Sequence, residues 1–489
     1  MESQPAREDE VRSGRPLIFR HAVVLTMDSA GVIEDGDVLV VGDTIVEVGR
    51  RLDAPDDAVE IDATGGILMP GMVDSHRHMW QTVMRGYGGD WSLSQYFTFY
   101  YLTHGKLFRP EDVYAGNLLS AIEAIDSGVT TTLDWSHGLQ TVDHAEAALE
   151  ALGSVPGRWV LGYGNLLGAP WEWSTSREFR AFVDRHFSSK NDMLGLQLAF
   201  DVTGQPGFPE QPAFETAREL DLAVTTHAGV WGATTDDGID QMAEAGCMTS
   251  RVTYVHSASL SQDSYQKIAA SGGNASVSAE SEDSAGQGYP STHELRRHGI
   301  PVSLSMDTSV WWSADMFSAM RATLNADRAR GHIEAHSRNE TVVNNDLRAE
   351  DVVRYATMGG ARALELESSI GSVTVGKKAD LVLLKNDESP TMTPILNPYS
   401  HVVFQASRAD VHTVVVNGSV LKYAGKRLEG DLEQARAATA STVDFLRSKM
   451  GEEAWHEGMT PELPAAELIP NPYTYTGWDG GNRLVRAED

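Results

Sequence analysis

The chain has 489 residues, of which 41% are hydrophobic, and it carries one cysteine and a formal net charge of −30 at pH 7. This length exceeds that of most single domains, so we expect one large domain and one smaller one. The acidic charge argues against nucleic acid as a partner, since such a surface needs basic residues. The single cysteine, Cys247, excludes an internal disulfide and fits a reducing cytoplasm.

The N-terminal segment is polar and has no apolar stretch of the kind found in secretory signals. No apolar run elsewhere is long enough for a membrane-spanning helix. We therefore expect a cytoplasmic protein without a membrane partner. Residues 1–16 are expected to be disordered, because they offer little apolar surface to bury.

Short predicted strands lie near both ends of the chain. Residues 17–66 alternate apolar and polar side chains between Gly and Asp turns, which is typical of an antiparallel sheet. A second strand-rich block lies within residues 369–427. Two such blocks on either side of a long α/β region predict one small β domain built from both ends of the chain.

Strands and helices alternate between these blocks, over residues 67–368, which favours βα units and a parallel sheet. The eight candidate strands are residues 67–74, 129–134, 158–163, 193–199, 223–227, 252–256, 274–278 and 301–306. Residues 428–489 are predicted to form an amphipathic helix followed by an irregular tail.

Two histidines, His76 and His78, end the first of these candidate strands. Residues two apart on a strand point to the same side, so both rings can bind a single cation. Neutral imidazole is a common ligand of zinc and related divalent metals. Paired surface histidines are also common, so this pair alone leaves open the alternative that no site exists.

Three further polar residues stand where predicted strands end: His227, His256 and Asp307. Parallel barrels build their active sites at this end of the strands. A buried structural histidine could explain any one of these positions, and Asp307 could be a plain helix N-cap. Their succession along one chain nevertheless favours a metal site.

At these residues the chain resembles the amidohydrolase superfamily, and within it the branch of cytosine deaminases and chlorohydrolases. The resemblance covers roughly residues 17–425 and includes the strand-end residues and the segments 69–78, 84–93, 356–364 and 370–382. It implies an α/β fold in which a (β/α)8 barrel, residues 67–368, lies beside a β-sandwich of residues 17–66 plus 369–427. It also implies a homodimer or homotetramer.

The resemblance further implies a metal held by His76, His78, His227 and Asp307, which would lower the pKa of its water towards about 7. Asp307 would accept the proton of this water and deliver it to the leaving group. His256 would hydrogen-bond the atom that develops charge. Members with two metals carry a lysine on the fourth strand, and residues 193–200 contain none. We therefore expect one divalent metal ion, Zn2+, with Fe2+ or Mn2+ as alternatives.

The chain departs from the deaminase pattern after its fifth candidate strand. Deaminases of this branch carry His-x-x-Glu, in which the glutamate protonates the substrate ring, and Val230 stands at the position of that glutamate. Either another acid replaces it, or the substrate needs no ring protonation. The candidate acids are Asp236, Asp237, Glu280, Glu282 and Asp283. Such charge runs are usually solvated, but Glu280 and Glu282 follow a strand end, so one of them is predicted to point inwards and act in catalysis.

Aromatic residues gather near the predicted strand ends. They favour a flat, apolar or heteroaromatic ligand held by stacking, although aromatic side chains more often belong to the core. The candidate substrate-binding residues are Trp80, Gln81, Trp91, His137, Trp231 and Trp312. For His137 a supporting hydrogen bond is the alternative.

These observations predict a mononuclear metal-dependent hydrolase that cleaves a non-peptide C–N bond of a small aromatic or heterocyclic molecule. One alternative is an amide, urea or carbamate hydrolase, for which the missing glutamate has no cost. A second is an elimination or rearrangement enzyme on the same scaffold, and a third is a metal-binding protein without catalysis.

Overall fold

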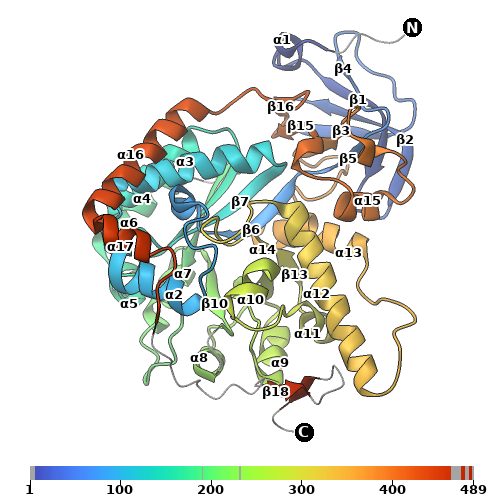
Figure 1. Cartoon of the computed structure of the whole chain (residues 1–489). Helices are drawn as coiled ribbons and strands as arrows, with labels where there is room; N and C mark the ends of the chain where they lie inside the picture. The colour runs from blue at the N-terminus through green and yellow to red at the C-terminus, as the bar shows by residue number, and fades with distance from the viewer. Residues whose placement is uncertain (1–5, 190, 231–232, 464–474, 479–483, 487–489) are drawn as a thin grey trace.

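The computed structural model describes residues 6–189, 191–230, 233–463, 475–478 and 484–486. An eight-stranded parallel sheet occupies the centre of the molecule, with helices around it (Figure 1). A nine-stranded sheet lies to one side of it, at the upper right of the figure. No helix of the described part is both long and apolar enough to cross a membrane.

The eight parallel strands follow one another in chain order from the first to the last. They are β6 (Met72–Arg77), β7 (Val129–Ser136), β8 (Arg158–Tyr163), β9 (Leu194–Ala199), β10 (Ala223–Ala228), β11 (Val252–His256), β12 (Asn274–Val277) and β13 (Val302–Leu304). A parallel bridge between Arg77 and Asp307 joins the end of the last strand to the first. The sheet is therefore a nearly closed barrel, which confirms the predicted (β/α)8 fold.

The prediction that residues 67–74 form the first barrel strand is wrong for residues 67–70. The chain divides at Gly71, so that β5 (Ile67–Pro70) pairs with strands of the other sheet and only β6 enters the barrel. A Cβ atom on Gly71 would lie 2.1 Å from Thr130 Oγ1. Only glycine therefore allows the chain to pass this closely over β7 and change sheets.

The nine-stranded sheet combines strands from both ends of the chain, as predicted. Its strands are β1 (Leu17–Leu25), β2 (Val32–Val41), β3 (Thr44–Gly49), β4 (Val59–Asp62), β5, β14 (Leu381–Leu384), β15 (Val411–Val416), β16 (Ser419–Tyr423) and β17 (Lys426–Arg427). Its pairs are antiparallel except those of β1 with β4 and β5. Inward side chains from β1 to β5 and β14 to β16 form one hydrophobic cluster. The sheet thus surrounds a core of its own.

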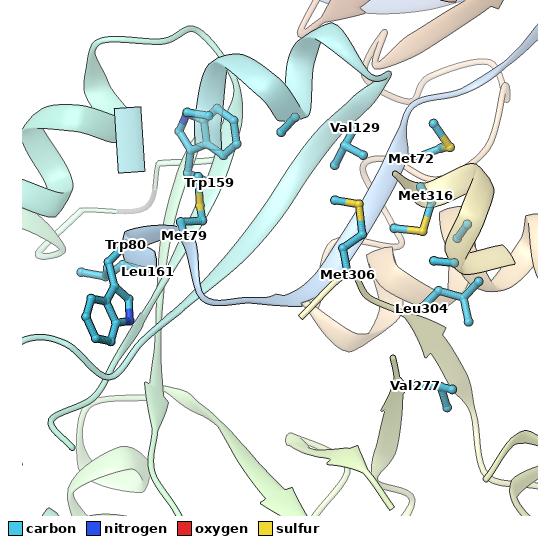
Figure 2. Close-up of a cluster of buried hydrophobic side chains, with 14 of the residues drawn as sticks. Met72, Met79, Trp80, Val129, Trp159, Leu161, Val277, Leu304, Met306 and Met316 are labelled. Carbon is cyan, nitrogen blue, oxygen red and sulfur yellow. The ribbon is translucent and has the colours of Figure 1, made fainter. Parts of the chain in front are cut away.

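Strand β14 shows how the two sheets are packed together. Leu381 and Leu383 belong to the core of the nine-stranded sheet, whereas Val382 and Leu384 belong to that of the barrel. Because successive side chains on a strand point to opposite faces, one strand contributes to both cores. Figure 2 shows part of the barrel core, with Met72, Val129 and Leu304 among its buried side chains.

A buried ion pair also joins the two sheets. Arg158 of β8 donates hydrogen bonds of 2.9 and 3.1 Å to the two carboxylate oxygens of Asp380, and both side chains are almost inaccessible. The backbone N–H of Asn417 donates to the same carboxylate at 2.8 Å. Two parallel N–H···O bonds of this kind fix the relative orientation of the elements that carry them.

Helices follow the barrel strands along the chain. Pro110 is the first residue of α3 (Pro110–Asp126), a position at which its missing N–H has no cost. The α-helices are α1 (Glu8–Val11), α2 (Leu93–Phe97), α3 (Pro110–Asp126), α4 (Val142–Gly153), α5 (Pro170–Trp173), α6 (Arg177–His186), α7 (Gln211–Glu219), α8 (Ala233–Glu244), α9 (Gln262–Ser271), α10 (Ala279–Ala285), α11 (Thr292–Arg297), α12 (Met316–Ser337), α13 (Ala349–Arg354), α14 (Gly360–Ala363), α15 (Pro398–Phe404), α16 (Leu432–Met450) and α17 (Glu452–Glu457). Short 3-10 or π turns are η1 (Met79–Met84), η2 (Thr98–His104), η3 (Gly105–Leu107), η4 (Tyr355–Gly359), η5 (Pro390–Met392) and η6 (Arg408–Asp410).

The described parts of both end segments pack onto the body of the protein. Residues 1–16 were expected to be disordered; of these, the structure describes residues 6–16, which include helix α1, whose Val11 is buried in the core of the nine-stranded sheet. At the other end, the segment after α16 accepts hydrogen bonds at three backbone carbonyls, from Tyr87, Trp91 and Gln95. This C-terminal segment therefore holds the chain that leads from η1 into α2.

Replacing Asp380 by Ala should lower the free energy of unfolding by about 3–5 kcal/mol, because it leaves the Arg158 guanidinium buried without a counter-charge. The measurement is urea denaturation followed by tryptophan fluorescence. The exposed pair of Arg180 and Glu219, 2.8 Å apart, is the matched control, and Glu219→Ala should cost no more than about 1 kcal/mol. Equal effects of the two substitutions would contradict this role of the buried pair.

Candidate active site

The polar residues predicted at strand ends converge at one mouth of the barrel. The ring centroids of His76 and His78 lie 4.7 Å apart, and those of His76 and His227 lie 5.0 Å apart. Asp307 Oδ1 lies 3.6 Å from His76 Nε2 and 3.5 Å from His78 Nε2. The ring of His256 stacks on that of His227 at 5.5 Å. The structure therefore brings together all five strand-end residues that the sequence singled out.

His78 and His227 are each held through Nδ1, which leaves their Nε2 atoms for the cluster. His78 Nδ1 lies 2.8 Å from the carbonyl oxygen of Trp135, and His227 Nδ1 lies 2.7 Å from Asp201 Oδ1. A carbonyl oxygen only accepts, so the Nδ1 of His78 carries the proton, and the carboxylate favours the same tautomer of His227. Metal-binding histidines are usually oriented by a partner of this kind.

The backbone fixes the place of Asp307. Its N–H donates to His76 O at 3.1 Å, and its carbonyl accepts from His78 N–H at 2.8 Å. Asp307 has a φ of +53°, a conformation that aspartate adopts more readily than most residues. The alternative of a helix N-cap is wrong, since the next helix, α12, begins at Met316 with Asp315 as its cap.

Unpartnered buried atoms show that this cluster fits a metal ion. Among the described residues, both ring nitrogens of His76 and Oδ2 of Asp307 are buried without a hydrogen-bond partner. Ligand atoms of His76, His78 and Asp307 lie within 4.8 Å of one another, as do those of His76, His227 and His256. Buried polar atoms without partners need an explanation, and imidazole nitrogens with a carboxylate oxygen are the ligands that zinc prefers.

The ionisation of the cluster agrees with metal binding. Burial lowers the pKa of His78 to about 4 and that of His76 well below its usual value, so both rings are neutral, which is the ligating form. Burial acts to raise the pKa of Asp307, but its contact with His76 and its proximity to His256 and His78 outweigh burial and lower the pKa. Asp307 is therefore a carboxylate at neutral pH.

Of the two acids expected to act after β12, only Glu282 points inwards, and it reaches His256 rather than the cavity. Its Oε1 lies 3.2 Å from His256 Nδ1 and accepts the backbone N–H of Ser278 at 2.8 Å. Burial raises the pKa of Glu282, although contact with His256 opposes this. Glu280 lies half-buried on α10, and burial together with Asp315 raises its pKa to about 7. Neither residue lines the cavity, because the turn into α10 directs them away from it.

A cavity of about 240 Å³ opens above the cluster. Its walls are mostly apolar or aromatic, and Val230 is one of them, so a valine side chain occupies the wall where the deaminase glutamate would stand. The lining residues are His78, Leu93, Tyr96, Phe97, Tyr101, Asp201, Val202, Thr203, His227, Val230, His256, Gln287, Asp307 and Trp311. The expected aromatic pocket is present, but its members differ from those predicted.

None of the predicted substrate-binding residues that the structure describes lines this cavity. Trp80 lies in the barrel core (Figure 2), and Trp91 donates to the carbonyl of Gly458. Trp312 is half-buried outside the cavity, and its neighbour Trp311 lines the wall instead. Trp231 lies outside the described residues, as do the side chains of Asp236 and Asp237. These residues follow strand ends, but beyond a strand end the position of a residue in the sequence does not fix the direction of its side chain.

Gln81 and His137 lie behind the wall and support it. Gln81 donates to the hydroxyl of Tyr96 at 2.7 Å, and His137 Nε2 lies 3.3 Å from the same hydroxyl. Thr308 donates to Gln81 Oε1 at 2.8 Å. The alternative stated for His137, a supporting hydrogen bond, is thus the one that the structure favours.

Sequence reasoning missed Asp201, which both contacts His227 and lines the cavity. Its signal was available, because Asp201 follows the end of β9 as Asp307 follows β13. Tyr96, Tyr101 and Trp311 also line the cavity, from α2, η2 and the segment after β13. They belong to the aromatic residues expected near the barrel mouth, but no sequence period shows which of these residues face it.

Comparison with known families assigns the chain to one of them. Residues 67–421, most of the chain, match the sequence profile of the amidohydrolase family. The chain belongs to the amidohydrolase family. This amidohydrolase is accordingly a hydrolase of carbon–nitrogen bonds other than peptide bonds.

Among its relatives is a 5-methylthioadenosine/S-adenosylhomocysteine deaminase of Pelotomaculum thermopropionicum, 28% identical over 86% of this chain and 96% of the relative. A zinc-bound adenosine deaminase from Xanthomonas campestris has the same fold, with a TM-score of 0.75 and 21% identity over 88% of this chain and 98% of that one. An atrazine chlorohydrolase from Arthrobacter aurescens complexed with zinc gives a TM-score of 0.75 and 20% identity over 87% and 100% of the two chains.

Replacing Asp307 by Asn in this amidohydrolase should reduce bound metal well below the wild-type content and abolish turnover, because the substitution removes a negative ligand and a proton acceptor. Metal content is measured by mass spectrometry of the purified protein. His144→Gln, a buried histidine on α4 far along the chain from the cluster, should retain the wild-type content. Full metal content and activity in the Asp307 variant would remove this residue from the site.

Proposed function

We propose that this amidohydrolase binds one zinc ion through His76, His78, His227 and Asp307 and hydrolyses the bond between an amino group and a small heteroaromatic ring. The observation that carries the proposal is the cluster itself, with its unpartnered buried nitrogens and carboxylate oxygen below an aromatic cavity. The deaminase names of its relatives and the zinc of its structural neighbours agree with it.

The proposal of a single ion rests on β9. Members of the superfamily with two metals carry a bridging lysine on the fourth barrel strand, and β9, Leu194–Ala199, contains none. Iron and manganese use the same nitrogen and oxygen ligands, so elemental analysis decides between them and zinc.

The proposed reaction assigns two proton-handling groups to this chain. The metal, when bound, supplies a water that ionises near neutral pH. Asp307, a carboxylate at this pH, accepts a proton at its unpartnered Oδ2 and transfers it towards the leaving nitrogen. His256, held at Nδ1 by Glu282, donates from Nε2 when it is protonated, and thereby stabilises the charge that develops on the substrate.

Val230 favours a second candidate function. Its apolar side chain lines the cavity where a ring-protonating acid would stand, so a substrate that needs such an acid is disfavoured unless His256 provides the proton. An amide, urea or carbamate needs no ring protonation, so Asp307 and His256 would suffice as the proton-handling groups for its hydrolysis. An elimination or rearrangement on the same scaffold stays a prediction without a structural observation in its favour.

The decisive experiment is a screen of the zinc-loaded protein against aminated heterocycles, with ammonia release and product mass as readouts. Ammonia together with a hydroxylated or oxo ring supports the first proposal. Release of a larger amine from an amide, urea or carbamate, without ammonia from any ring, supports the second. A product that retains every atom of the substrate contradicts both.

Glu282→Gln should lower kcat by about 100-fold or more, because His256 loses the carboxylate that holds its Nδ1 and orients the ring. KM and metal content should change little, since Glu282 touches neither the cavity nor the predicted ligands. Glu280→Gln, on the same helix, should remain close to wild type. A matching loss in both variants, or in neither, would contradict a role for Glu282 in positioning His256.

Two further statements remain predictions from the sequence. They are the cytoplasmic location, which rests on the single cysteine, and assembly into a homodimer or homotetramer, which rests on the family resemblance. Light scattering coupled to size-exclusion chromatography determines the second.

A further inference from the structure

The charges on the cavity wall have one sign. Of the described residues that line the cavity, none is lysine or arginine, and the two carboxylates are Asp307, within the cluster, and Asp201. A ligand of the cavity therefore meets carboxylates and no lysine or arginine among the described lining residues.

Asp201 stands where a ligand can reach it. One of its oxygens, Oδ1, lies 2.7 Å from His227 Nδ1, while the side chain as a whole remains 38% exposed and lines the cavity. Its neighbours on the wall, Val202 and Val230, are apolar and offer a ligand no competing hydrogen bond. Among the described cavity residues outside the metal cluster, Asp201 is the one with a charged side chain.

The remaining wall suits a flat ring that carries positive charge. Phe97 and Tyr101 stack on each other at 4.5 Å with an angle of 16°, and Tyr96 packs against Trp311 at 4.6 Å. All four line the cavity. The negative faces of such rings attract a cation by about 0.5–2 kcal/mol at each favourable contact, whereas an anion gains nothing from them.

We propose that Asp201 is a specificity residue, which selects rings that bear a cationic or strongly N–H-donating group, of the amidine or aminopyrimidine kind, and rejects carboxylates and phosphates. This inference rests on the proposed function, because it takes the cavity as the substrate pocket. The selected group donates to the Asp201 carboxylate while the ring lies between the aromatic side chains. A ring whose anionic group lies beside Asp201 would instead meet like charge in a partly desolvated place, which is costly.

Asp201 could alternatively serve only to orient His227. Asparagine separates the two roles, because its amide oxygen still accepts the N–H of His227 but carries no charge. Glutamate complements it, since it keeps the charge. Asp283 on α10 provides a matched control: it is an exposed carboxylate that does not line the cavity, so Asp283→Asn removes one unit of charge without changing the wall.

The test measures binding of benzamidine, benzamide and benzoate to the zinc-loaded protein by isothermal titration calorimetry at pH 8. These three probes share a ring and differ in charge. In Asp201→Asn we expect benzamidine to bind about 10-fold more weakly, benzoate to bind more tightly, and benzamide to change less than about twofold. Asp201→Glu and Asp283→Asn should keep the wild-type preference for benzamidine over benzoate.

Three results would overturn the inference. They are an unchanged benzamidine-to-benzoate ratio in Asp201→Asn, the same shift in Asp283→Asn, and loss of the preference in both the Asn and the Glu variants, which would leave Asp201 with the orientation of His227 alone. Binding of these probes requires no turnover. Failure of the proposed function would instead appear as the absence of ammonia release from every ring amine, with the charge preference intact.

Discussion

The site depends on the closure of the barrel between its first and last strands. Asp307 donates its N–H to the carbonyl of His76 and accepts the N–H of His78, so one residue from each side of the seam holds the other in place. Beneath it, the buried carboxylate of Asp74 accepts the N–H groups of His76 and Met306 at 3.3 and 3.1 Å. These bonds set three metal-type side chains within reach of one point before any ligand arrives, which is the preorganisation that catalysis requires.

Around this seam, His78, His227 and His256 each have a hydrogen-bond partner of a different chemical kind. The carbonyl of Trp135 holds His78, the cavity aspartate Asp201 holds His227, and the deeply buried Glu282 holds His256. A carbonyl oxygen, a partly exposed carboxylate and a buried acid thus orient the three rings. The proposed tasks of these rings, metal binding for the first two and proton donation for the third, rest on these orientations.

The barrel and the metal cluster could be predicted from the sequence because each rests on a local signal. Buried parallel strands are short apolar runs, and a polar residue at the end of such a run must lie at the barrel mouth, as His227 and Asp307 do. The direction of each wall side chain could not be predicted, because the wall comes from short helices and loops beyond the strand ends, where no sequence period shows which side faces the cavity. Trp80 and Trp311 illustrate this: both follow strand ends, yet only the second faces the cavity.

The junction at Gly71 has a consequence for the newly made chain. Strand β5 pairs with β1 on one side and with β14 on the other, in a register that sets Pro70 opposite Leu381. On the ribosome, all eight barrel strands are therefore synthesised before β14, which pairs with the second edge of β5 in the nine-stranded sheet. Until then β5 presents an open edge directly beside β6, and an unpaired edge of this kind invites association with other chains. This edge of the growing polypeptide is covered only when β14, Leu381–Leu384, has emerged.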